Sequence, residues 1–94
     1  MTAPDSNDPH ATFEYFSSEY AQALQAFAAI ETQASALQLM GYTDELRKFI
    51  DQFIEMAART QALAQDRNEV NFAEWFRELV EKAEKLRTPL PLQP

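Results

Sequence analysis

A single glycine, Gly41, stands in this chain of 94 residues. A β-rich fold of this length needs several tight turns, and tight turns normally use glycine where the backbone takes a positive φ. One glycine cannot supply them, so the sequence predicts an all-α protein. The length provides for one domain with one core. A hydrophobic fraction of 46% is typical of a chain that folds.

The longest periodic segment precedes this glycine and predicts a helix over residues 12–40. Its heptad a positions are Phe13, Tyr20, Phe27 and Ala34, and its d positions are Phe16, Ala23, Ile30 and Leu37. This unbroken pattern indicates coiled-coil-like packing at a shallow crossing angle. The helix has two candidate starts, because Asp8 can cap it with Pro9 in the first turn, or Thr12 can cap it directly. Gly41 is expected to end it in the left-handed conformation.

A second helix is predicted over residues 43–67, with Thr43 as its N-cap. Asn68 can end this helix in the left-handed conformation. The short link at residues 41–43 makes the first two helices antiparallel neighbours.

A third helix is predicted over residues 71–87. Asn71 and Glu74 have the spacing of a capping box, and Val70 and Trp75 that of the hydrophobic staple that accompanies it. Pro89 ends the helix near Arg87. The alternative is that the second and third helices form one bent helix.

The predicted architecture is an up-down-up three-helix arrangement, a long helical hairpin plus a shorter third helix. Residues 1–11 are expected to form a disordered arm, residues 12–87 a single helical domain, and residues 88–94 an extended proline-rich tail. The tail contains a minimal P-x-x-P segment, which we interpret as a helix terminator followed by a frayed end.

Helix lengths predict a homodimer. The first helix should span ~40 Å and the third only ~24 Å, so the hairpin end around Gly41 is left with two helices. Apolar residues crowd at that end, and a second copy related by a two-fold axis would bury them and complete a bundle. A different protein offering a complementary helix would satisfy the same requirement. The predicted interface is Ile30, Leu37, Leu39, Met40, Leu46, Phe49, Ile50, Phe53 and Ile54.

The outer side of the first helix is a second candidate contact surface. Between Tyr20 and Met40 the only charged residue is Glu31. A helix side that faces water normally carries charges, whereas small residues allow close backbone approach. The residues concerned are Ala21, Gln22, Gln25, Ala26, Ala28, Ala29, Ser35, Ala36 and Leu39.

The net charge of −7 comes entirely from residues 1–46, which carry seven acids and no Lys or Arg. Such a half repels phosphate backbones and anionic lipids, so neither nucleic acid nor a membrane is an expected partner. There are no cysteines, which excludes disulfides and thiolate chemistry. No signal peptide is visible in the acidic, polar start of the chain, and we expect a cytoplasmic protein.

Few residues suggest a catalytic or metal-binding role. His10 is the only histidine, and a solvated imidazole is favoured over a catalytic one. Glu78, Glu81 and Glu84 share one side of the third helix, as in all-α Mg²⁺-dependent hydrolases. Pairing of Glu78 with Lys82, and of Glu81 with Lys85, explains the same residues as a salt-bridged surface.

The sequence therefore predicts a non-enzymatic helical protein–protein interaction module: an oligomeric adaptor, regulator or assembly subunit with no cofactor or metal. The alternative is a small all-α metal-dependent hydrolase that uses the carboxylates of the third helix. A mimic of nucleic acid is a third class, supported by the net charge alone.

Overall fold

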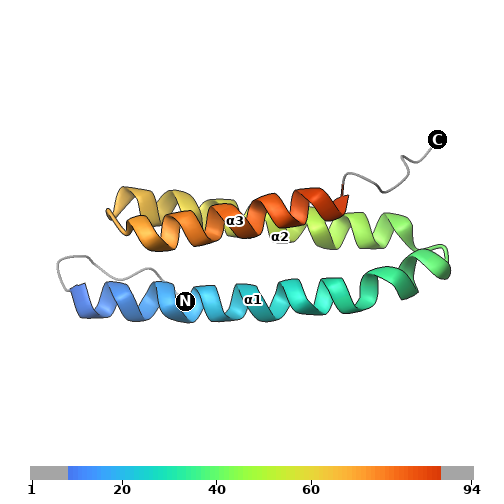
Figure 1. Ribbon diagram of the computed structural model, residues 1–94, viewed down its shortest axis with the longest axis horizontal. Helices are drawn as coiled ribbons and strands as arrows, with labels where there is room; N and C mark the ends of the chain where they lie inside the picture. The colour runs from blue at the N-terminus through green and yellow to red at the C-terminus, as the bar shows by residue number, and fades with distance from the viewer. Residues whose placement is uncertain (1–8, 88–94) are drawn as a thin grey trace.

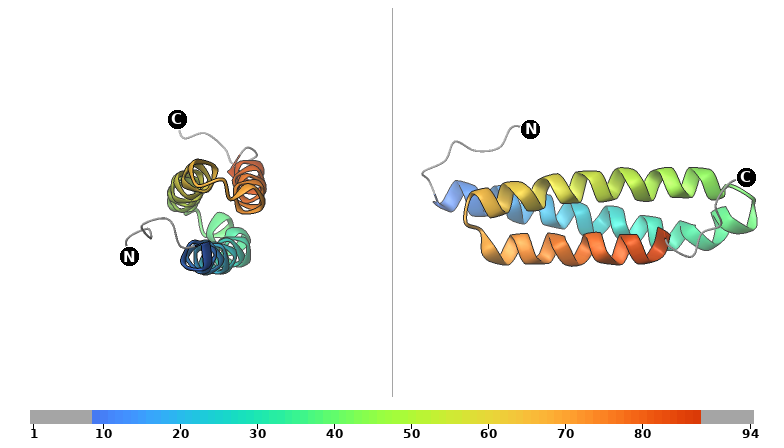
Figure 2. Two further views of the ribbon diagram at one scale, coloured as in Figure 1. Left: turned by 90° about the vertical axis from the view of Figure 1, so that its left-hand side faces the viewer. Right: turned by 90° about the horizontal axis from the view of Figure 1, so that it is seen from above.

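The computed structural model describes the backbone of residues 9–87 and the side chains of residues 11–87. It contains three helices, α1 (Pro9–Leu39), α2 (Thr43–Asp66) and α3 (Val70–Arg87). They run up, down and up, and pack side by side into a rod of 49 × 19 × 18 Å (Figure 1 and Figure 2). The predicted all-α arrangement, a long hairpin with a shorter third helix, is confirmed.

The turn between α1 and α2 is built on Gly41, which has a φ of 83°. Its N–H donates to the carbonyl of Gln38 at 3.1 Å, and the N–H of Tyr42 donates to the carbonyl of Leu37 at 2.8 Å. These two bonds are a Schellman motif, which satisfies the last carbonyls of a helix and places a left-handed residue after it. A Cβ at residue 41 would meet no atom within 4 Å, so backbone conformation alone favours glycine here.

The turn between α2 and α3 repeats this motif without a glycine. Asn68 has a φ of 60°, and its N–H donates to the carbonyl of Gln65 at 3.1 Å. The N–H of Glu69 donates to the carbonyl of Ala64 at 2.8 Å. The predicted left-handed role of Asn68 is confirmed. The alternative of one bent helix is wrong, because a left-handed residue interrupts the helical hydrogen bonds at this point.

The predicted N-caps of α2 and α3 are wrong. Residue Thr43 already belongs to α2, and Tyr42 before it makes no side-chain capping bond. Asn71 likewise lies inside the first turn of α3, and the carboxylate of Glu74 binds Arg77 instead of closing a capping box. Val70 is 73% exposed, so no buried staple forms there. α2 begins at its predicted cap residue and α3 one residue before its predicted cap, and a difference of this size is enough to misassign a cap.

α1 begins at Pro9, the earlier of its two candidate starts. Residues 9–11 were expected in the disordered arm and are helical instead. The rest of the predicted arm, residues 1–8, and the predicted tail, residues 88–94, lie outside the described residues.

One core runs along the rod, and its largest fully buried side chains are Phe16, Leu46, Ile50 and Phe76. Seven of the eight predicted heptad positions of α1 belong to this core or pack against it. The exception is Phe13, which is 54% exposed. Among residues 11–87, the buried core is Phe16, Ala23, Phe27, Leu46, Ile50, Phe53, Ala57, Ala64, Phe72, Ala73, Phe76, Leu79 and Ala83.

α3 packs most extensively on α2, and an ion pair fixes its end. Arg87 donates to the carboxylate of Asp51 at 2.7 Å. Aromatic rings join α3 to α1, with Phe16 stacked on Phe72 at 5.7 Å and Tyr20 edge-on to Phe76 at 5.5 Å between ring centroids. α3 therefore covers one side of the hairpin.

Candidate interaction surface

A solvent-open hollow between α1 and α2, here called the α1–α2 groove, has a volume of about 420 Å³. Nothing from α3 lines it. Its walls are mostly apolar, and only two amide side chains interrupt them. The lining residues are Ala26, Ala29, Ile30, Gln33 and Leu37 from α1, and Leu46, Phe49, Gln52, Phe53 and Met56 from α2.

A second hollow of about 400 Å³, here called the Tyr15 groove, continues this surface toward the other end of the rod. Met56 lines both hollows, so they adjoin on one side of the hairpin. The second is more polar, since Glu19 and Arg59 take part in its lining. Partial burial, together with the negative charge of Glu19, raises the pKa of the Tyr15 phenol.

Further exposed apolar residues lie in the groove wall and at the end of the hairpin. Phe49 is 48% exposed although it is aromatic, and Leu39 is 89% exposed. Met40 beside it is 64% exposed. Single exposed apolar residues are ordinary, whereas a contiguous apolar surface marks a site of interaction.

The residues of the predicted interface differ in burial, and Leu46 and Phe53 both belong to the core and line the groove. Leu46, Ile50 and Phe53 belong to the core of a single chain, so their expected exposure is wrong. These residues are buried because α2 lies between α1 and α3. The two neighbouring helices cover the broad apolar stripe of α2 from two sides. Ile54 also packs against this core. The groove is lined by Ile30, Leu37, Leu46, Phe49 and Phe53, while Leu39 and Met40 lie exposed at the hairpin end.

The predicted interface omitted five residues that line the groove: Ala26, Ala29, Gln33, Gln52 and Met56. Two of them, Ala26 and Ala29, belong to the uncharged outer side of the first helix that the sequence did single out. Met56 follows Phe49 by seven residues and therefore lies on the same side of α2. That spacing is the sequence signal that could have found it.

A smaller apolar patch lies at the opposite end of the rod, where α2 turns into α3. Phe13, Val70 and Trp75 are each at least 41% exposed there. The Trp75 ring lies 5.4 Å from that of Tyr20 and 5.3 Å from that of Phe72, measured between centroids. Trp75 is thus packed on one side and open on the other.

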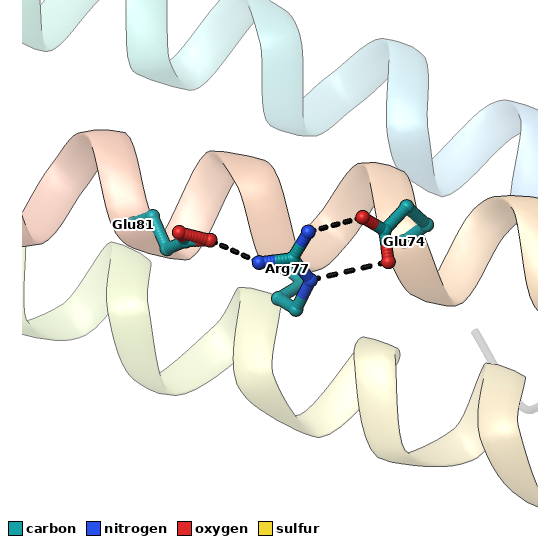
Figure 3. Close-up of polar contacts among 3 residues, drawn as sticks. All are labelled: Glu74, Arg77 and Glu81. Carbon is teal, nitrogen blue, oxygen red and sulfur yellow. Dashed lines mark hydrogen bonds and ion pairs between the residues drawn. The ribbon is translucent and has the colours of Figure 1, made fainter.

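Two carboxylates of α3, Glu74 and Glu81, form ion pairs with one arginine. Arg77 lies between Glu74 and Glu81 and binds both, with its Nε donating to Glu74 at 3.1 Å (Figure 3). This hydrogen bond holds the pKa of Glu74 below its usual value. Glu81 pairs with Arg77 instead of the predicted Lys85. Residues 11–87 contain no group of three His, Asp or Glu side chains placed to hold a metal ion.

No helix within the described part of the chain is long and apolar enough to cross a membrane. The side chain of His10 and the P-x-x-P segment lie outside the described residues. Comparison of the chain with protein-family models, with curated proteins and with solved structures gives no match.

Proposed function

We propose that this protein is a non-enzymatic helical protein–protein interaction module that works as a homodimer. The observation that carries the proposal is the apolar α1–α2 groove with the half-exposed Phe49 in its wall. Aromatic anchors in apolar hollows are the residues that contribute most to binding between proteins.

The surroundings of the groove support the same proposal. From Tyr20 to Met40, α1 carries one charged residue, Glu31. A partner that covers this side removes almost no charge from water, which keeps the cost of association low. Charged residues are depleted in the centres of protein interfaces for this reason.

The hydrolase receives no comparable support. Its central carboxylate, Glu81, is occupied by Arg77, which also binds Glu74. A cation competing for Glu81 would first have to displace this guanidinium.

Light scattering coupled to size exclusion tests the proposal. We expect a species of twice the 10.8 kDa chain mass at micromolar concentration. Phe49→Glu should weaken the dimer by at least about 30-fold, the effect of losing about 2 kcal/mol at an interface.

Ala62→Glu is the matched control, because it adds the same charge to an exposed position of α2 that does not line either groove. It should leave the dimer intact. A monomer in the unmodified protein would refute the homodimer, and a Phe49→Glu variant that stays dimeric would move the interface to another surface.

A further inference from the structure

We infer that the two copies pair side by side about a two-fold axis parallel to the rod, so that α2 of each copy packs on α1 of the other. The four helices then share one core, with Phe49 of each copy seated in the partner's α1–α2 groove. This inference rests on the proposed dimer and specifies its geometry.

The dimensions of the rod disfavour an end-to-end dimer. Its end measures 19 × 18 Å, roughly 350 Å², and its long side 49 × 19 Å, roughly 900 Å². A stable interface buries about 800 Å² on each partner, which only the long side can supply. The exposed Leu39 and Met40 therefore form the edge of the interface, and the grooves form its centre.

Charge favours the α1–α2 side over the α2–α3 side. On the side where α2 meets α3, the surface carries the ion pairs of Arg77 with its two glutamates and that of Arg87 with Asp51. A second copy, which also has a net charge of −7, would have to disrupt or desolvate these pairs. The α1–α2 side carries one ion pair at the Tyr15 groove, that of Arg59 with Glu55, and otherwise offers the nearly uncharged run of α1.

The sizes of the side chains that would face each other favour a two-fold axis parallel to the rod. Phe27 of α1 and Phe53 of α2 lie at one level of the rod, with ring centroids 5.6 Å apart. Phe49 is one turn nearer the hairpin end, so an axis along the rod places it opposite Ile30 of the partner subunit. The smaller Ala29 and Ala26 adjoin that position in the groove, and large side chains pack well against small ones.

An axis perpendicular to the rod would be less favourable. It stacks α2 of one copy on α2 of the other, so that the bulky side with Phe49 and Met56 meets the same side of the partner. It also stacks α1 on α1, so that alanines face alanines. It also separates the two hairpin ends, leaving Leu39 and Met40 of each copy exposed. The parallel axis buries both ends together and places Glu19 near the level of Arg59 of the partner subunit.

Disulfide trapping distinguishes the two axes, and the chain contains no cysteine of its own. Ala29→Cys and Gln52→Cys variants, refolded together, should form a disulfide-linked heterodimer, because α1 of one copy adjoins α2 of the other. Met56→Cys alone should not link to itself, because the two α2 helices are diagonal and their Cα atoms exceed the about 7 Å that a disulfide spans. Ala28→Cys, exposed on the next position of α1, is the control and should give no product with Gln52→Cys.

Each outcome decides the inference. A mixed product confined to the Ala29→Cys and Gln52→Cys pair supports the parallel axis. Self-linking of Met56→Cys would overturn it in favour of the perpendicular axis. A dimer by light scattering with no cross-link at any of these positions would also overturn it and leave the proposed function standing, whereas a monomer would refute both.

Discussion

Gly41 and Asn68 occupy the same position in two equivalent turns, yet only one of them is glycine. Asparagine tolerates the left-handed region better than other residues with a side chain, because its short amide can hydrogen-bond locally. An ordinary side chain in that conformation costs roughly 1–2 kcal/mol. The turn that separates α2 from α3 therefore depends on one asparagine.

Asn68→Ala should lower the free energy of unfolding by about 1 kcal/mol, whereas Asn68→Gly should leave it unchanged or raise it slightly. Urea unfolding followed by circular dichroism measures both. Asn71→Ala is the control, since Asn71 is exposed inside α3 and should change stability by less than about 0.5 kcal/mol. If Asn71→Ala proved the costlier substitution, the helix would begin at the capping box after all.

Tyr15 predicts a pH dependence of stability. Burial, and secondly the charge of Glu19, raises its pKa above the ordinary 10.0, so the folded chain holds the phenol proton more tightly than the unfolded chain. The stability that Tyr15 contributes is thus present below that ordinary value and is lost as pH rises through the folded pKa. Urea unfolding from about pH 9 to about pH 11 should show a steeper loss for the unmodified protein than for Tyr15→Phe. Equal slopes would contradict this account.

At the scale of the elements, the sequence predicts the number, type and order of the helices because local chemistry specifies them. An uninterrupted apolar period predicts α1, and two residues suited to positive φ predict both turns. The caps were not predictable to the residue, because Thr43 and Asn71 satisfy the composition of a cap while the backbone turns helical just before them. Composition restricts a cap to a few residues, and backbone geometry selects among them.

The attachment of α3 gives a prediction at this scale. Phe76 is 0% exposed and Trp75 is 41% exposed, although the sequence predicts that Trp75 packs against Val70 in a hydrophobic staple. Phe76→Ala should therefore cost about 3–5 kcal/mol, as buried aromatics do. Trp75→Ala should cost no more than about 2 kcal/mol, because 41% of its surface is already in water. Denaturation followed by circular dichroism compares them, and an equal cost would mean that another surface covers Trp75.

At the scale of the whole molecule, the sequence predicts that an apolar surface is left over but only some of the residues that form it. The apolar stripe of α2 is wider than one neighbouring helix can cover. Its two neighbours, α1 and α3, pack on opposite flanks of it, so Leu46 and Ile50 are buried while Phe49 stays half exposed. That division depends on the rotation of α2 about its own axis, which is set by tertiary packing and not by periodicity.

The charge of the whole molecule gives the last prediction. Two chains of net charge −7 repel each other at long range, while the proposed contact side of α1 has one charge between Tyr20 and Met40. Raising the salt concentration from about 10 mM to about 150 mM shortens the screening length from about 30 Å to about 8 Å, which removes most of the repulsion and few attractive pairs. The dimer Kd from analytical ultracentrifugation should therefore fall several-fold.

A variant with Asp44→Asn and Glu45→Gln has a smaller net charge and should show a weaker dependence on salt. Both acids lie in the first turn of α2 and line neither groove, so the central contact of Phe49 should be unchanged. A Kd that rises with salt would mean that ion pairs hold the two copies together. That result would contradict an interface formed by Phe49 and the alanines of α1, since apolar contacts do not weaken as charges are screened.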